Sequence, residues 1–238
     1  MTKGYIFDYG GTLDTGGRHW GKVLWRAYVR HGVPVTENQF REAYVHAERT
    51  LGSRPIIMPD FTFRQTLDAK LRIELEHLTA TGALDADAAE VGKLRQEMLD
   101  DLYEDVKAET SRSRKVLEAV ARSYKLALVS NFYGNVNTVL HELCFDGLFA
   151  DVIESAVVGI RKPDPRIFML GVEALGLKPS ETTVVGDSIG KDIIPARQIG
   201  CRTVWLKGEG WDDTPQDESQ PDTIITELSQ ILDKEKDF

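Results

Sequence analysis

Apolar positions along the chain follow two different periods, and the change between them divides the sequence into three stretches. A continuous apolar run over residues 4–8 predicts a buried strand. For about ninety residues after it, apolar positions recur at helical spacing, and this stretch is too long for a loop. From about residue 108, short apolar runs alternate with helical patterns. This order predicts a parallel α/β core with a helical segment inserted after its first strand.

The inserted segment is predicted to contain four helices. The first has apolar side chains at helical spacing from Trp20 to Tyr28. Thr36 and Thr62 each stand three residues before a glutamine, a capping-box pattern that predicts the start of two more helices. Asp85 is predicted to open the fourth helix. Between two of the helices, residues 51–55 are rich in helix breakers and predict an exposed loop. Four helices of this kind can bury one shared core.

The later part of the chain predicts a doubly wound, Rossmann-like parallel sheet. Its apolar runs are nearly continuous, as expected for strands that are covered by helices on both faces. Ligands bind such sheets beyond the carboxyl ends of the strands. We therefore expect an α/β core of residues 1–14 and 108–238 and a helical cap domain of residues 15–107. Later strands are expected at Lys125–Ser130, Asp151–Glu154, Thr183–Asp187, Arg202–Leu206 and Thr223–Ile225, and helices at Val116–Ala121, Val139–Leu143, Pro165–Leu175 and Gly190–Gln198.

Net charge and cysteine content limit the expected partners and compartment. The chain of 238 residues carries a formal net charge of −9, which argues against a nucleic-acid or anionic-membrane surface. No apolar stretch approaches the roughly 20 residues that a membrane-spanning helix needs. The two cysteines form no disulfide framework, and the first residues lead into a strand instead of a signal sequence. We therefore expect a cytoplasmic protein with no nucleic-acid or membrane partner.

Carboxylates are expected to gather at one edge of the sheet. Asp8 closes the first strand and precedes a glycine-rich turn, while Asp187 and Asp192 follow a later strand. Carboxylates that are packed together repel one another and resist ionisation unless a cation or a proton intervenes. Ligand sets made only of oxygen favour magnesium. The three side chains therefore predict a Mg²⁺ site.

Four short segments carry the candidate chemistry. They are Asp8-x-Gly10-Gly11-Thr12, Val129-Ser130-Asn131, Arg161-Lys162-Pro163-Asp164-Pro165 and Gly186-Asp187-Ser188-x-x-x-Asp192. As a set, in this order and spacing, they resemble the haloacid dehalogenase superfamily of hydrolases. The resemblance covers residues 1 to about 14 and about 108 to 210. It implies that the helical segment is a cap that closes over the site.

The resemblance also implies an aspartyl nucleophile and a bound metal ion. Asp8 would attack an electrophilic centre, most often phosphorus, to give an aspartyl-phosphate that water hydrolyses. Mg²⁺ held by Asp8, Asp187 and the carbonyl of Gly10 would offset the repulsion between carboxylate and phosphate. Asp192 would support the metal shell.

A set of phosphate contacts follows from the same resemblance. Lys162 would supply a positive charge to a phosphate oxygen and to Asp8, as a catalytic residue. Ser130 and the backbone amide of Asn131 would donate hydrogen bonds to the developing charge, and Gly11 would lie in the same phosphate-binding turn. Ser130 and Asn131 also have a plainer interpretation, because such residues cap helices.

Gly10 departs from the pattern of the family. Phosphatases of the family usually carry a second aspartate at this position, which acts as general acid and base. Loss of a positioned acid typically costs about 10²- to 10⁴-fold in rate. One solution is a leaving group that departs as an anion, such as an acyl phosphate, pyrophosphate or a phenol. Another is a proton donor from elsewhere, for which Asp14, Tyr9 and His19 are candidates.

The leading hypothesis is a Mg²⁺-dependent phosphatase that acts on a small phosphorylated metabolite. A non-catalytic phosphate-binding or regulatory module, which has lost turnover with its acid, is one alternative. Another is a hydrolase of a non-phosphate electrophile. Dehalogenases of the family lack the second aspartate but need no magnesium. The phosphonate-cleaving branch uses a cap lysine, for which Lys22, Lys70 and Lys93 are candidates.

Overall fold

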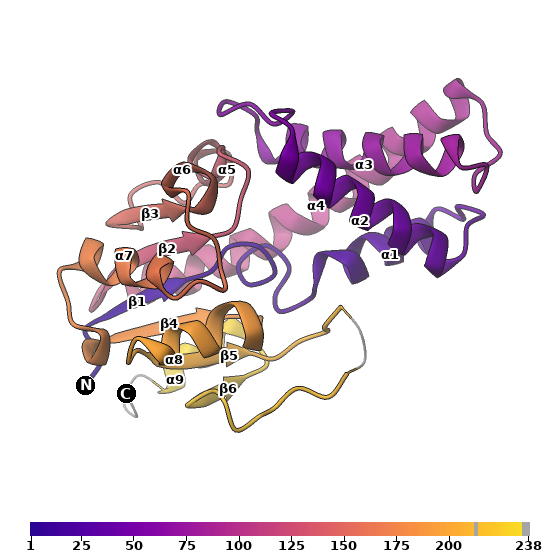
Figure 1. The fold of residues 1–238 in the computed structure, drawn as a ribbon. Helices are drawn as coiled ribbons and strands as arrows, with labels where there is room; N and C mark the ends of the chain where they lie inside the picture. Colours follow the sequence, from indigo (N-terminus) through magenta and orange to yellow (C-terminus); the bar gives the residue numbers. More distant parts are fainter. Residues whose placement is uncertain (212–213, 235–238) are drawn as a thin grey trace.

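A six-stranded parallel sheet forms the centre of the molecule. The computed structural model describes residues 1–211 and 214–234, and within this part the strand order is β3-β2-β1-β4-β5-β6. Helices lie on both faces of the sheet (Figure 1), so the predicted doubly wound α/β fold is confirmed. Residues 212–213 and 235–238 of the predicted core lie outside the described residues. The strands are β1 (Gly4–Phe7), β2 (Lys125–Ser130), β3 (Asp151–Glu154), β4 (Thr182–Gly186), β5 (Arg202–Leu206) and β6 (Thr223–Ile225).

Alternate side chains of β1 enter two separate apolar layers. Tyr5 and Phe7 belong to the larger buried cluster, and Ile6 between them belongs to a second one, because successive side chains of a strand point to opposite faces. The first layer includes the carboxyl-terminal part of α4 and α5, and the second includes α7 and α8. The central strand β1 is therefore buried on both faces, as its continuous apolar pattern predicts. These helices are α4 (Ala88–Val120), α5 (Val136–Glu142), α7 (Arg166–Leu175) and α8 (Ile194–Gln198).

Helices α1 (Trp20–Arg30), α2 (Glu37–Ser53), α3 (Phe63–Ala80) and the first part of α4 form the segment between β1 and β2. We call residues 15–107 the helical insert. Both predicted capping boxes are present, because Thr36 and Thr62 each exchange hydrogen bonds with the glutamine three residues later. These local contacts set where α2 and α3 begin.

Two predicted boundaries in the insert were wrong. Helix α2 continues through Leu51, which is buried in a small apolar cluster, and this packing outweighs the helix breakers around it. Helix α4 starts after Asp87, whose side chain accepts the amides of Ala89 and Glu90, and not at Asp85. It then runs unbroken to Val120, so the separate helix predicted from residue 116 is its last part. The expected boundary between residues 107 and 108 therefore lies inside one helix.

Short elements complete the described chain. The helix predicted at Gly190–Gln198 begins as a π-helical turn, Ile189–Ile193, and continues as α8. Two further short helices, α6 (Ser155–Val158) and α9 (Ile231–Lys234), were not predicted from the apolar pattern. Two 3₁₀ turns lie at Pro179–Glu181 and Leu228–Gln230.

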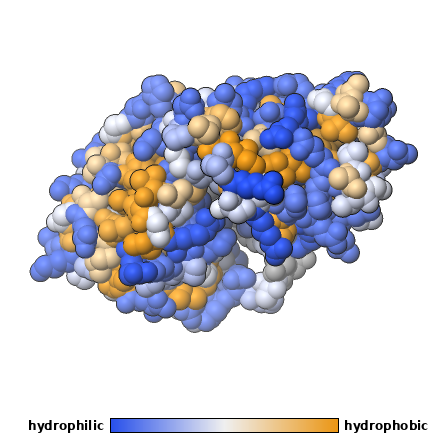
Figure 2. All heavy atoms as spheres, turned by 45° about the horizontal axis from the view of Figure 1, so that its top comes forward, coloured by the Kyte–Doolittle hydropathy of each residue, from blue (hydrophilic) through white to orange (hydrophobic). Residues whose placement is uncertain are grey.

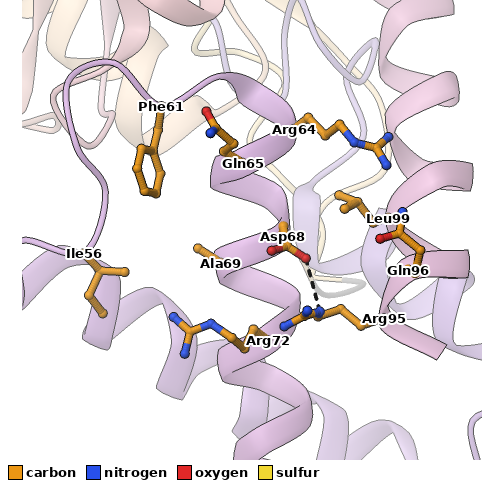
Figure 3. A pocket seen from close by; sticks show the side chains of 10 residues that line it. All are labelled: Ile56, Phe61, Arg64, Gln65, Asp68, Ala69, Arg72, Arg95, Gln96 and Leu99. Atoms are coloured by element: carbon orange, nitrogen blue, oxygen red, sulfur yellow. Dashed lines mark ion pairs between the residues drawn. The ribbon is translucent and has the colours of Figure 1, made fainter. Parts of the chain in front are cut away.

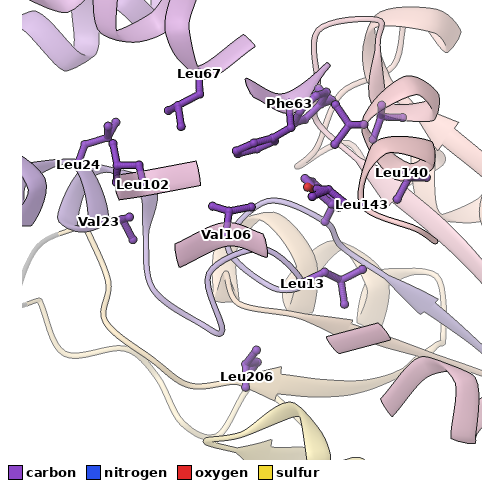
Figure 4. Close-up of a cluster of buried hydrophobic side chains, with 14 of the residues drawn as sticks. Leu13, Val23, Leu24, Phe63, Leu67, Leu102, Val106, Leu140, Leu143 and Leu206 are labelled. Atoms are coloured by element: carbon purple, nitrogen blue, oxygen red, sulfur yellow. The ribbon is translucent and has the colours of Figure 1, made fainter. Parts of the chain in front are cut away.

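One apolar cluster is shared by the helical insert and the α/β core. Figure 4 shows Leu24, Leu67 and Leu102 of the insert in the same buried group as Leu13 and Leu206 of the core. The insert therefore packs directly against the core in this structure.

The surface is mainly polar on the face shown in Figure 2, where apolar side chains form separate patches between hydrophilic ones. Among the described residues, no helix combines the length and the apolar character that crossing a lipid bilayer requires.

Candidate active site

The central strands bring the predicted acidic residues to one edge of the sheet. β1 lies between β2 and β4 and pairs with both in parallel. Asp8 follows β1, Ser130 ends β2 and Asp187 follows β4, so all three lie at carboxyl ends of neighbouring strands. Figure 1 shows the helical insert beyond this edge.

Lys162 is buried between two carboxylates. Its ammonium lies 2.6 Å from Oδ1 of Asp8 and 2.7 Å from Oδ1 of Asp192, and its side chain is only 2% exposed. Burial lowers the pKa of Lys162, but Asp192 and Asp8 raise it above its ordinary value, so the ammonium stays charged. The Asn131 side chain donates to the carbonyl of Lys162 at 3.1 Å and accepts its amide at 2.9 Å. This pair of bonds fixes the lysine backbone beside the carboxylates.

Asp8, Asp187 and Asp192 form a compact acidic cluster. Each offers one oxygen, and these atoms lie within 4.8 Å of one another. Burial raises the pKa of Asp8 to about 6 in spite of Lys162. Burial and the nearby Asp192 and Asp8 also raise the pKa of Asp187 well above its usual range. A divalent cation would relieve this repulsion, and a donor set made only of oxygen fits Mg²⁺.

Glycines permit this close packing. Gly11 has a φ of +95°, and a Cβ there would lie 2.5 Å from the Asp187 carboxylate. A Cβ at Gly186 would lie 2.5 Å from the Asp192 side chain. Only glycine tolerates both the positive φ at position 11 and these approaches. Asp187 is also held by the hydroxyl of Thr12, which donates to its Oδ1 at 3.2 Å.

The turn after β4 has contacts that sequence reasoning missed. Asp192 lies in the π-helical turn, a geometry that is frequent at functional sites. Its Oδ1 pairs with Lys162, and its Oδ2 accepts the amide of Ser188 at 3.1 Å. The indole of Trp205 donates to the carbonyl of Asp187 at 2.8 Å. No sequence signal marks this last bond, because it joins two neighbouring strands whose register is set only by folding.

Ser130 has an unpaired buried hydroxyl. Its Oγ has no hydrogen-bond partner in the part of the chain that the structure describes, which costs about 1–3 kcal/mol. The helix-capping interpretation of Ser130 and Asn131 is wrong, because α5 begins at Val136 with Asn135 in its N-cap position. A bound anion would supply the missing acceptor.

The backbone at position 10 leaves room for a side chain. A Cβ at Gly10 would meet no atom within 4 Å. Among the alternative proton donors, Asp14 accepts the amide of Gly11 at 2.7 Å and the indole N–H of Trp20 at 2.8 Å. Burial raises the pKa of Asp14 to about 7. Asp14 therefore links the nucleophile turn to the helical insert and can hold a proton near neutral pH.

His19 and Tyr9 are poor proton donors at neutral pH. Nδ1 of His19 accepts the amide of Gly21 at 3.1 Å at the start of α1. Burial and the charge of Lys191 lower the pKa of His19 to about 4, so its ring is neutral at pH 7. Burial and Asp14 raise the pKa of Tyr9 well above its ordinary value. Neither group releases a proton readily in this setting.

The structure distinguishes the three candidate lysines of the insert. Lys93 is 78% exposed, and Lys22 lies 3.9 Å from a glutamate on α2. Lys70 is buried on α3, where its ammonium forms an ion pair with Glu48 and lies 4.5 Å from the centre of the Tyr44 ring. Lys70, whose side chain is 9% exposed against 17% for Lys22, is therefore the most enclosed of the three.

Two cavities, of about 510 and 540 Å³, lie along α3 and α4. Figure 3 shows the first, in which Asp68 of α3 and Arg95 of α4 form an ion pair at 3.2 Å. None of the predicted site residues lines either cavity. These hollows are therefore separate from the acidic cluster.

Comparison with known proteins agrees with this fold. The family model of haloacid dehalogenase-like hydrolases matches residues 2–200. The chain therefore belongs to this family and is a hydrolase.

Individual relatives include phosphatases. Phosphoserine phosphatase of Thermus thermophilus is 30% identical over 177 residues, which are 64% of this chain and 70% of the relative. Glyceraldehyde 3-phosphate phosphatase of Pyrococcus furiosus is 37% identical over 89 residues, and this match spans only 37% of each chain. The structure of L-2-haloacid dehalogenase from Xanthobacter autotrophicus has a TM-score of 0.61 at 18% identity and covers 99% of both chains. This last likeness shows a shared fold.

Proposed function

We propose that this protein is a Mg²⁺-dependent phosphatase that acts on a small phosphorylated metabolite through an aspartyl nucleophile. The observation that carries the proposal is the buried chain of ion pairs from Asp8 through Lys162 to Asp192, beside Asp187. The phosphatase names of two relatives support phosphate as the electrophile. In this proposal residues 15–107 are the cap that covers the site.

Asp8 is the nucleophile in this mechanism. Its Oδ1 contacts the Lys162 ammonium and accepts the amide of Tyr9 at 2.8 Å. Among the described residues no hydrogen bond engages its Oδ2, which is therefore the oxygen available for attack. A new bond forms from Oδ2 to phosphorus, and the bond from phosphorus to the leaving oxygen breaks and passes its electron pair to that oxygen. Water then attacks phosphorus and releases the Asp8 carboxylate and phosphate.

The same residues can hold the metal and the phosphoryl group. Asp8, Asp187 and the carbonyl of Gly10 would hold Mg²⁺, with Asp192 supporting the shell. When bound, the ion supplies positive charge that offsets the repulsion between the carboxylate and the phosphate. The remaining phosphoryl contacts would come from Lys162, the unpaired hydroxyl of Ser130, the amide of Asn131 and the turn at Gly11.

The leaving group determines how much the missing acid matters. Because Gly10 cannot transfer a proton, leaving oxygens that depart as stable anions are favoured, as in acyl phosphates, pyrophosphate and aryl phosphates. Asp14 is the one alternative donor whose pKa is near neutral. Its two oxygens already accept hydrogen bonds from Gly11 and Trp20, so we assign it mainly to bracing the turn.

Carbon–phosphorus cleavage through a cap lysine is less well supported. Burial lowers the pKa of Lys70, but Glu48 and other neighbours raise it well above its ordinary value. A charged, paired ammonium is not a free amine nucleophile.

A panel of phosphate compounds tests the proposal. Acetyl phosphate, pyrophosphate, p-nitrophenyl phosphate and glycerol phosphate are incubated with the protein, with and without Mg²⁺. We expect turnover that requires Mg²⁺ and is abolished in Asp8→Asn, with the first three compounds faster than the alkyl ester. Asp105→Asn is the matched control, because Asp105 pairs with Arg30 at the surface.

Several outcomes would contradict the proposal. If no compound shows turnover that depends on both Mg²⁺ and Asp8, the protein is not this kind of phosphatase. Phosphate binding without any turnover would favour the regulatory module. Halide or aldehyde release would favour hydrolysis of another electrophile.

A further inference from the structure

Helix α2 contacts two segments that follow strands of the sheet. Near its start, Arg41 donates to the carbonyl of Trp211 at 3.0 Å, and the Tyr44 and Trp211 rings lie 4.9 Å apart. One turn later, Glu48 accepts the hydroxyl of Tyr133 at 3.2 Å on both of its oxygens. Trp211 follows β5 and Tyr133 follows β2.

The sheet order then locates Glu48. β1 and β4 lie between β2 and β5. β2 and β5 are therefore about 14 Å apart, at about 4.8 Å per strand step. The seven residues from Arg41 to Glu48 span about 10 Å of helix. Arg41, Tyr44 and Glu48 share one helix face, because they are three and four residues apart. This face of α2 therefore joins the segments that follow β2 and β5, the two strands on either side of β1 and β4, and Asp8 and Asp187 follow β1 and β4.

Glu48 is held firmly in this position. Its carboxylate forms the ion pair with Lys70 of α3, whose ammonium is enclosed by the Tyr44 ring at 4.5 Å and the Trp20 ring at 6.0 Å. The lysine side chain is 9% exposed, but that of Glu48 is 33% exposed. Lys70 and Tyr133 thus orient the carboxylate, and part of the side chain stays exposed.

The open carboxylate is an acceptor and not an acid. Burial raises the pKa of Glu48, but Lys70, Tyr133 and Lys191 together lower it below its ordinary value. Glu48 is therefore ionised at neutral pH and has no proton to give to a leaving oxygen. It can accept a hydrogen bond strongly, because charged acceptors make the stronger bonds.

We propose that Glu48 determines substrate specificity by accepting a hydrogen bond from a hydroxyl group of the leaving group, and that Lys70 and Tyr133 are its positioning residues. This inference rests on the proposed function, in which the phosphoryl group occupies the acidic cluster and the leaving group points toward the insert. A neutral hydroxyl fits better than a cation, because the ammonium groups of Lys70 and Lys191 already neutralise this region. The leaving group then carries a free hydroxyl in addition to the oxygen that is bonded to phosphorus.

Calorimetric titration of the Asp8→Asn protein tests the inference without requiring turnover. With Mg²⁺ present, glycerol 1-phosphate is compared with propyl phosphate, which has the same carbon chain but no free hydroxyl. We expect glycerol 1-phosphate to bind about 10- to 100-fold more tightly, as for one hydrogen bond to a charged acceptor. Adding Glu48→Gln should reduce this ratio to below about threefold and leave the Kd for propyl phosphate within about twofold.

Two further variants separate recognition from folding. The double variant Glu48→Met/Lys70→Met removes both members of the ion pair together, so it is expected to fold and to lose the same preference. Tyr133→Phe should lose part of the preference for glycerol 1-phosphate over propyl phosphate. Glu76→Gln is the control, because Glu76 pairs with Arg72 at the exposed side of α3 and should keep the full ratio.

The inference is overturned if the two ligands bind equally before Glu48 is changed, or if both Glu48 variants keep the preference. It is also overturned if phosphoethanolamine binds more tightly than glycerol 1-phosphate and this preference depends on Glu48. Glu48 would then recognise the ammonium group of the ligand instead of a hydroxyl. If propyl phosphate itself does not bind, phosphate is not the ligand, and the proposed function fails with the inference.

Discussion

Restoring a carboxyl group at position 10 is the sharpest test of the missing acid. A Cβ at Gly10 would meet no atom within 4 Å, and the backbone there is not in the left-handed region that favours glycine. Gly10→Asp should therefore fold without strain. The neighbouring Gly11 is the opposite case, since its φ is +95° and its Cβ would lie 2.5 Å from Asp187.

The expected gain follows from the chemistry of the leaving group. A positioned acid contributes about 10²- to 10⁴-fold, which is about 3–5 kcal/mol of activation free energy at about 1.36 kcal/mol per factor of ten. The new carboxyl group would stand near Asp8 and Asp187, whose negative charges raise its pKa toward the value that a general acid needs. An alkyl phosphate should gain the full factor. An aryl phosphate should gain little, because a phenolate leaves without a proton.

The assay compares kcat/KM for glycerol phosphate and p-nitrophenyl phosphate in the wild type and in Gly10→Asp. The ratio of the two values should shift toward the alkyl ester by at least about 100-fold. Gly11→Ala is the steric control and should lose activity on both substrates. An equal change on both substrates in Gly10→Asp, or a loss on the alkyl ester, would refute the reasoning and indicate chemistry adapted to glycine.

Three other predictions concern buried polar groups. Burial raises the pKa of Glu74 from 4.5 to about 7. Ionisation of Glu74 therefore destabilises the folded state progressively as the pH rises from about 4.5 through 7. Glu74→Gln should increase the free energy of unfolding in urea by up to about 3 kcal/mol at pH 8 and hardly at all at pH 4. Lys162→Met should abolish turnover and lower the free energy of unfolding by about 3–5 kcal/mol at pH 7.5, because Asp8 loses its buried counter-charge. At pH 5, where Asp8 is protonated, the same substitution should lower the free energy of unfolding by less. Trp20→Phe removes the hydrogen bond to Asp14 and should lower the free energy of unfolding in urea by about 1.5–3 kcal/mol. The control is Trp25→Phe, whose ring packs on Phe40 in the same helix bundle. It keeps the bond between Trp20 and Asp14 and should not show this loss.

Sequence alone determined the elements whose signals are local. The apolar period separated the helical insert from the parallel sheet, since strands and helices place side chains on a buried face at different spacings. The capping boxes at Thr36 and Thr62 marked two helix starts, because both partners of each box lie within four residues. The acidic residues at strand ends were found because parallel strands direct their carboxyl ends to one edge.

Only the tertiary structure decided the contacts between distant segments. The hydrogen bonds that hold the backbone of Lys162 come from the side chain of Asn131, which is 31 residues away. Glu48 accepts a hydrogen bond from Tyr133, which is 85 residues away. Apolar spacing says which helix face is buried, but it does not say which polar side chain that face meets. Leu51 stayed helical for a similar reason, because the free energy of packing outweighed a local preference for a turn. The same holds for the open space at Gly10, which depends on how the surrounding chain folds around it.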